Sequence, residues 1–177
     1  VLHRLAELDQ KVREGYAKYD FQGVFQAIFT FATVDLSAYY FDIRKDALYC
    51  DADDSPRRLA ARTVLDILFH RLTKWLALML TFTMEEVWLE RFPGEESSVH
   101  LVDIPETPAA WRDDALADKW AAIRRVRRVV TAALEVQRRD KVIGASLEAA
   151  PDIYIADSGV REALDGLDVK GKTVQLT

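Results

Sequence analysis

The sequence predicts a mainly α-helical protein, a helical bundle of five to six helices with a small α/β appendage at its C-terminal end. Apolar residues recur every three to four positions over most of residues 1–142, which is the period of helices that bury one face. After Gly144 the segment "SLEAAPDIYIAD" alternates as a strand does, although Pro151 confines such a strand to a sheet edge or a strand start. We therefore expect a helical-bundle domain over residues 1–143 and the start of a small α/β subdomain over residues 144–177.

The first half of the chain predicts three helices. The first spans residues 1 to about 19, with Leu2, Leu5, Leu8 and Val12 on one stripe. Asp20 can cap a second helix that runs through residue 50, with a bend near residues 33–35. Ser55 followed by Pro56 is typical of an N-cap and first helical position. The third helix therefore begins there, and its apolar spacing carries it to about Leu80.

The second half predicts a short helix, an irregular segment and a long helix. Thr83 and Glu86 fit a capping box for a helix that Pro93 and Gly94 end. Residues 94–112 are Pro-rich and predict at most a short extended piece at "SVHLVDI". A helix follows from about Asp113 to Val142, and "SGVREALDGL" predicts another short helix before a strand-like "KTVQLT".

Arg44 conflicts with its predicted helix. At about 100° per residue, Leu36, Tyr40, Ile43 and Ala47 share the inward side, and Asp35 falls opposite. Arg44 then points into the side that should be buried. We expect a structural arginine whose stem passes the core or which pairs with a buried acid; the alternative is direct contact with a ligand.

Composition and motifs limit the classes of function that this chain can have. The net charge is −5, so any nucleic-acid binding needs a local basic patch. Cys50 is the only cysteine, which excludes a disulfide framework and favours a reducing, cytoplasmic location. Neither a membrane span nor zinc-ligand spacing, a P-loop or a nucleophile motif occurs in the sequence. We therefore expect no catalytic residues, no metal site and no cofactor in this chain.

The strongest binding pattern lies in "WAAIRRVRRVVTAALEVQRRDKVIG", residues 120–144. Its helical wheel separates an apolar face from an arginine stripe, interrupted only by Glu135. The stripe contains Arg124, Arg127, Arg128, Arg138 and Arg139. Guanidinium groups suit phosphate because they donate two hydrogen bonds at once. Trp120 borders the stripe and could stack on an unpaired base. The alternative is an ordinary solvated helix face with Trp120 in the core.

A second basic group opens the helix that starts at Pro56. Arg57 and Arg58 lie in its first turn, where cations oppose the helix dipole. We expect them to support binding of a polyanion; the alternative is solvated surface.

Three stretches carry a family resemblance. "DLSAYYFDIRKDALYCD", "LTFTMEEVWLERFPGEESSVHLVDIPE" and "IRRVRRVVTAALEVQRRDKVIGASLEA" resemble, in order and spacing, the anticodon-binding region of isoleucyl-tRNA synthetases. These enzymes form a class I subgroup with the valyl and leucyl enzymes. The match spans about residues 1–155, and "VIGASLEA" favours the isoleucyl over the valyl enzymes. Lys45 matches a lysine of the family pattern and joins the predicted tRNA-binding residues.

The resemblance implies a helical tRNA-binding domain that works within a longer, monomeric enzyme. The parent would join isoleucine to its tRNA with ATP, and could carry zinc elsewhere. Its partners would be the isoleucine tRNA, through the anticodon stem-loop, and the remaining synthetase domains in the same polypeptide. The alternatives are the same domain of a valyl-type synthetase, or a helical protein–protein interaction module whose arginines are incidental.

Overall fold

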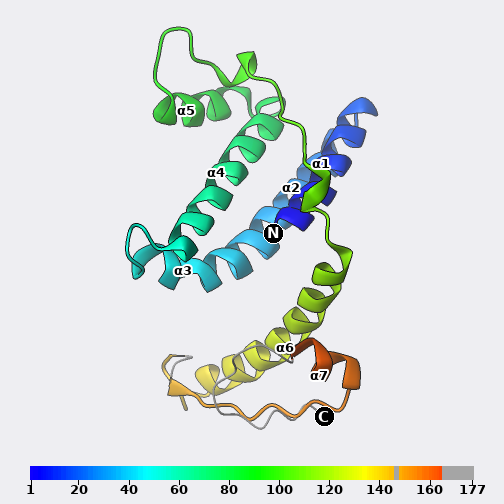
Figure 1. The fold of residues 1–177 in the computed structure, drawn as a ribbon, viewed down its shortest axis with the longest axis vertical. Coiled ribbons are helices and arrows are strands. Elements are labelled where there is room, and N and C mark those ends of the chain that lie inside the picture. Colours follow the sequence, from blue (N-terminus) through cyan, green and yellow to red (C-terminus); the bar gives the residue numbers. More distant parts are fainter. Residues whose placement is uncertain (146–147, 165–177) are drawn as a thin grey trace. The chain divides into compact units, whose positions relative to one another are not determined.

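A computed structural model describes residues 1–145 and 148–164 and is mainly helical, as predicted (Figure 1). One unbroken helical run follows the first helix: its middle is a π-helix, η1, and α segments lie on either side. The elements of the N-terminal part are α1 (Leu2–Ala17), α2 (Phe21–Thr30), η1 (Phe31–Phe41), α3 (Asp42–Tyr49), α4 (Pro56–Ala77) and α5 (Thr81–Arg91). They are followed by two 3-10 turns, η2 (Val99–Leu101) and η3 (Ala109–Trp111), and by α6 (Asp114–Arg139) and α7 (Ser158–Leu164).

The chain divides into two compact units, residues 1–112 and the part that begins at residue 113. The predicted boundary between residues 143 and 144 does not coincide with this division, because α6 packs with the residues that follow it. Ala122 and Val126 of α6 form a small core with Ile155 and with Val160 of α7.

The main core of the first unit is drawn from α1, α2, η1 and α4. Trp75 of α4 is fully buried at its centre. The other buried members are Leu5, Leu8, Val12, Val24, Ile28, Phe31, Leu36, Tyr40 and Leu68. The predicted inward stripe of α1 is thus confirmed, and burial of this apolar face is what stabilises the helices against one another.

Polar side chains set several helix starts. The Asp20 carboxylate accepts a hydrogen bond from the Gly23 N–H at 2.9 Å and caps α2 as predicted. Asp113 caps α6 in the same way through the Leu116 N–H. Pro56 is the first residue of α4, although the Ser55 hydroxyl bonds to the Asp51 carboxylate and not to a helix N–H.

One local prediction in the first unit is wrong: α5 begins at Thr81, so Thr83 lies inside the helix and the capping box with Glu86 does not form. The segment "SVHLVDI", for which at most a short extended piece was expected, contains the turn η2 between extended Ser98 and Val102. The Glu85 carboxylate accepts from the Ser98 hydroxyl and the Val99 N–H, and this local bonding holds the segment as a turn against α5.

The predicted α/β appendage is found only in part. α7 confirms the short helix at "SGVREALDGL". Residues 148–157 hold a single bridge at Tyr154 and no strand, and Pro151 lacks the N–H that a ladder hydrogen bond requires. The "KTVQLT" strand lies outside the described residues.

η1 changes which residues face the core. A π-helix bonds residue i to i+5, so each residue turns by less than an α-helical residue does. Leu36 and Tyr40 are buried as predicted, but Asp35 is buried too, whereas Ile43 is 42% exposed. The assumed rotation of 100° per residue was wrong through this segment.

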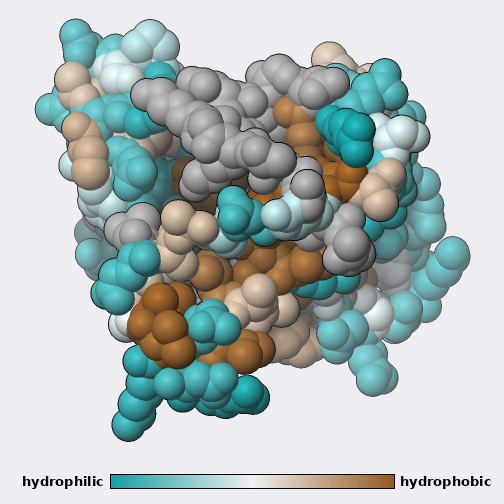
Figure 2. All heavy atoms as spheres, turned by 90° about the horizontal axis from the view of Figure 1, so that it is seen from below, coloured by the Kyte–Doolittle hydropathy of each residue, from teal (hydrophilic) through white to brown (hydrophobic). Residues whose placement is uncertain are grey.

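The surface also carries apolar side chains. Figure 2 shows apolar groups that reach the surface among hydrophilic ones.

None of the helices formed by the described residues combines the length and the apolar character needed to cross a membrane.

Candidate nucleic-acid interface

The predicted arginine stripe lies on α6, the longest helix described. Arg128, Arg138 and Arg139 are exposed, and Arg124 and Arg127 are partly buried. Arg124 and Arg127 each have an interaction partner. The stripe therefore exists as a helix face, but its members differ in how freely they could reach a ligand.

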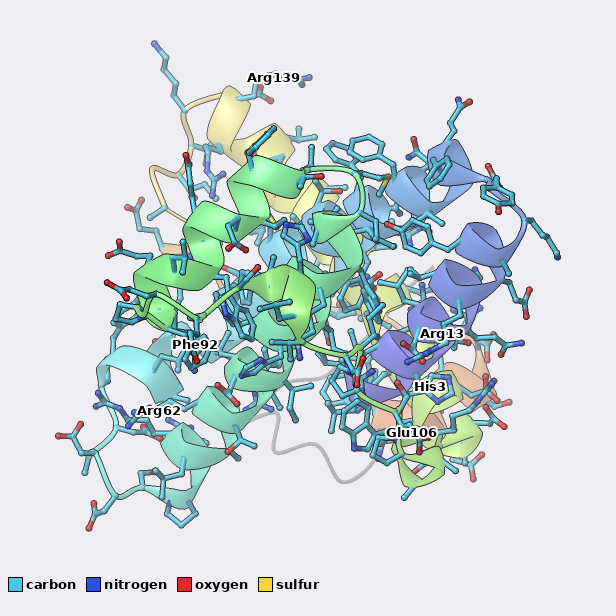
Figure 3. All side chains as sticks on the ribbon, turned by 90° about the horizontal axis from the view of Figure 1, so that it is seen from above. His3, Arg13, Arg62, Phe92, Glu106 and Arg139 are labelled. Atoms are coloured by element: carbon cyan, nitrogen blue, oxygen red, sulfur yellow. The ribbon has the colours of Figure 1, made fainter. Side chains whose placement is uncertain are left out.

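Two of the exposed arginines pair with neighbouring carboxylates. An Nη1 atom of Arg138 lies 2.5 Å from Oε1 of Glu135, and Nε of Arg139 lies 3.2 Å from Oδ1 of Asp140. Figure 3 shows Arg139 at the end of α6. Solvent-exposed ion pairs of this kind contribute about 0–1 kcal/mol, so a phosphate could replace the carboxylate at little cost.

Arg125 is a candidate that the sequence did not single out. It is exposed, one turn before Arg128, and neither residue is held by a hydrogen bond or ion pair to another described residue. On the helical wheel Arg125 borders Val129 and Val136, which belong to the apolar face of α6. These valines are 54% and 43% exposed. Because this edge of α6 is uncovered, Arg125 reaches solvent, which the apolar pattern alone could not reveal.

Trp120 occupies an intermediate position. Its side chain is 39% exposed and also has a partner in the structure. The residue is therefore partly accessible to a ligand.

The supporting cations of the first unit are tied to local acids. Lys45 lies 3.0 Å from the Asp42 carboxylate. Arg57 donates two hydrogen bonds to Asp51, at 2.7 and 2.5 Å, and this pairing lowers the pKa of the Asp51 carboxyl and raises that of Arg57. Arg58 donates to the Asp51 carbonyl at 2.7 Å and pairs with Asp53 at 3.0 Å. Arg57 and Arg58 thus organise the turn before α4, and the structure brings these two together around Asp51.

Arg44 lies against an aromatic ring. Its guanidinium carbon is 5.8 Å from the centre of the Tyr40 ring, and its Nε atom is buried without a hydrogen-bond partner. Burial raises the pKa of Tyr40, and the neighbouring Arg44 opposes that shift. The side chain therefore packs along the helix, as a stem that passes the core would.

The first unit contains a buried polar cluster that was not predicted from the sequence. Arg71 of α4 is 3% exposed and donates hydrogen bonds to the carbonyls of Pro105 and Glu106. Its guanidinium also lies 5.6 Å from the ring centre of Trp111. Lys74 donates to the Asp103 carbonyl at 3.1 Å. We call residues 103–111 the strap, because α4 side chains hold this segment by its carbonyls.

The strap is fastened from α1 as well. Arg13 donates to the Pro105 carbonyl at 2.9 Å and to the Asp9 carboxylate at 2.9 Å. Figure 3 shows Arg13 and Glu106 on the same side of the molecule. A helical wheel shows Asp9 and Arg71 only as polar residues at the border of an apolar face, so the signal for a long-range cluster was absent.

Comparisons with known proteins identify the family of the chain. A family model described as the anticodon-binding domain of tRNA ligase matches residues 1–153. The chain therefore belongs to the family of anticodon-binding domains of tRNA ligases.

Its relatives include isoleucine–tRNA ligases. The chain is 69% identical to the isoleucine–tRNA ligase of Ruegeria pomeroyi over 169 residues. This aligned region covers 96% of the chain and 17% of the ligase. The chain is 58% identical over 168 residues to that of Brucella abortus (95% and 17%), and 52% identical over 169 residues to that of Bartonella henselae (96% and 17%). The chain thus spans about 17% of the length of these relatives, and the resemblance seen in the sequence is confirmed.

Proposed function

We propose that this domain holds the anticodon stem-loop of an isoleucine tRNA for an isoleucine–tRNA ligase. The observation that carries the proposal is the family match over residues 1–153 together with relatives that are named isoleucine–tRNA ligases. Aminoacylation with ATP would take place in other domains of the parent, in the cytoplasm, and this domain would contribute recognition without a metal or cofactor of its own.

Recognition would rest on α6. Exposed Arg125, Arg128 and Arg139 would bind phosphates and set the register of the RNA, since phosphate contacts position a complex while base contacts specify it. Arg124, Arg127 and Arg138 would add to the local positive potential. Trp120 would stack on a splayed-out base, the mode by which single-stranded loops are commonly read. Three cations of the first unit, Lys45, Arg57 and Arg58, would contribute further phosphate contacts after exchanging their carboxylate partners for phosphate.

A filter-binding titration tests the proposal. The isoleucine tRNA transcript should bind with higher affinity than the same transcript with a changed anticodon. Affinity should also fall with salt, by about 0.7 log units per phosphate contact for a tenfold rise in salt concentration. Equal affinity for both transcripts, or affinity that does not respond to salt, would contradict a role in anticodon recognition and favour a protein-interaction module.

A further inference from the structure

One face of α2 exposes a row of aromatic side chains. Phe21, Phe25 and Phe29 follow one another at helical spacing and are 45%, 46% and 51% exposed. Val34 of η1 continues the row and is 50% exposed. The rings of Phe25 and Phe29 stack with centres 5.8 Å apart. We call these four residues the α2 stripe.

The α2 stripe and the segment that bears it contain no charged residue. Residues 21–34 contain no Asp, Glu, Lys, Arg or His, in a chain of which 30% is charged. The exposed polar neighbours are Gln22, Gln26, Thr30 and Thr33. Beyond this rim, Gln26 and Thr30 line a hollow together with Arg4, Glu7 and Lys11 of α1. The cations there stand beside a carboxylate, so they do not provide the excess positive charge that RNA and anionic membrane surfaces need. An uncharged aromatic centre with a mixed polar rim is instead the composition of a protein–protein interface.

We propose that the α2 stripe is the docking surface for another domain of the same polypeptide, which presents an apolar, uncharged face to it. The inference rests on the proposed function, in which the chain works as one domain of a longer synthetase. Relatives that match 95–96% of the chain contain about 83% of further sequence, because the match covers 17% of them. That length provides the partner surface.

The size of the α2 stripe favours a covalently linked partner over a second copy of the chain. The stripe runs from Phe21 of α2 to Val34 of η1, so its exposed face is about 20 Å long and about 11 Å wide, on the order of 200–250 Å². A stable interface between free proteins needs about 800 Å² per partner. A linked domain has an effective concentration in the millimolar range, so a small apolar contact is sufficient to hold it.

Hydroxyl-radical footprinting of the full-length synthetase tests this inference. Oxidation of Phe25 and Phe29 is compared with that in the urea-denatured enzyme, with Phe31, 3% exposed, as the buried reference. We expect Phe25 and Phe29 to be protected at least fivefold, close to Phe31. Oxidation at about half the denatured rate would overturn the inference, because that is the rate an uncovered stripe would give.

The same experiment separates the other occupants. Protection should not change with enzyme concentration or with added tRNA. Protection that appears only at high enzyme concentration identifies a second copy, and protection that appears only with tRNA identifies RNA; either result overturns the inference. tRNA affinity is measured on the same preparation, so a failure of the proposed function shows as lost anticodon discrimination while the protection remains.

A matched pair of variants adds a second readout. Phe25→Lys places a charge in the α2 stripe, whereas Thr63→Lys places one at an exposed position of α4. In the full-length enzyme Phe25→Lys should lower the melting temperature by several degrees and restore oxidation of Phe29, and Thr63→Lys should do neither. Equal melting temperatures for the two variants would argue against a covered stripe.

Discussion

Arg71 and Asp9 form a buried contact between α4 and α1: Nη1 of Arg71 lies 3.5 Å from Oδ1 of Asp9, and the side chains are 3% and 8% exposed. The same guanidinium holds the strap through the carbonyls of Pro105 and Glu106. Burial lowers the pKa of Arg71, and the Asp9 carboxylate opposes that shift. One side chain therefore joins two helices and an irregular segment that lacks secondary structure of its own over most of its length.

Replacing Arg71 with Met should destabilise the first unit by about 2–4 kcal/mol, because it leaves buried carbonyls and a carboxylate with fewer partners. Arg13 still contacts Asp9, which limits the loss. Urea unfolding measures the effect. Arg62→Met, at an exposed position of the same helix, is the control and should change stability by less than about 0.5 kcal/mol. Equal effects of the two variants would show that the cluster contributes nothing.

Replacing Arg44 with Leu should leave the stability unchanged or raise it by about 1 kcal/mol, since the buried Nε atom has no hydrogen-bond partner and an apolar side chain carries no such penalty. Thermal melting and tRNA titration are measured together. Weaker tRNA binding with an unchanged melting temperature would assign Arg44 to the RNA interface and contradict a structural role.

Substitutions of Asp20 and Gly23 should change the free energy of unfolding in a strongly non-additive way. Asp20→Ala removes the α2 cap and should cost about 1 kcal/mol. A Cβ at Gly23 would lie 2.2 Å from Oδ2 of Asp20, so Gly23→Ala forces the cap to open and loses its helix-propensity gain. In the Asp20→Ala background the obstacle is gone, and Gly23→Ala should then stabilise by about 0.5–1 kcal/mol. A double-mutant cycle by urea unfolding measures the coupling, and additive values would contradict it.

His70 should make stability depend on pH. Burial lowers the pKa of its imidazole below 6.5; the Asp66 carboxylate opposes this shift, and Lys74 and Arg91 add to it. Below about pH 6.5 the unfolded chain therefore binds a proton that the folded protein does not, so the free energy of unfolding falls as the pH drops, by at most about 1.4 kcal/mol per pH unit.

The control for this effect is removal of the titrating group. His70→Gln should flatten the pH dependence of unfolding between pH 7.5 and 5.5, whereas His100→Gln, at an exposed position, should keep it. A slope that persists in His70→Gln would assign the pH dependence to other groups.

Arg125 and Arg128 of α6 should contribute more to RNA affinity than lysines elsewhere on the surface. Arg125→Ala combined with Arg128→Ala should weaken tRNA binding and reduce the salt slope by about 1.4 log units per tenfold change in salt, for two lost contacts. Lys11→Ala combined with Lys18→Ala removes the same charge from exposed positions associated with α1. If this control loses as much affinity as the arginine variant, binding depends on net charge and α6 is not the interface.

The helices and several of their ends could be predicted from the sequence. Apolar spacing predicted α1, α4 and α6, the Asp20 side chain predicted the start of α2, and Pro56 predicted the start of α4. These features depend on contacts within one or two turns, which a sequence displays directly. The arginine stripe and the family resemblance were visible for the same reason.

Burial where the helical period changes, and the contacts between distant segments, could not be predicted from the sequence. The π-helical turn of η1 buried Asp35 and exposed Ile43, and uncovered Val129 left Arg125 accessible. The strap depends on Arg71, Arg13 and Lys74 reaching carbonyls some 29 to 92 residues away. Such long-range hydrogen bonds leave no periodic pattern, because their energy comes from satisfying buried polar groups that the fold alone brings together.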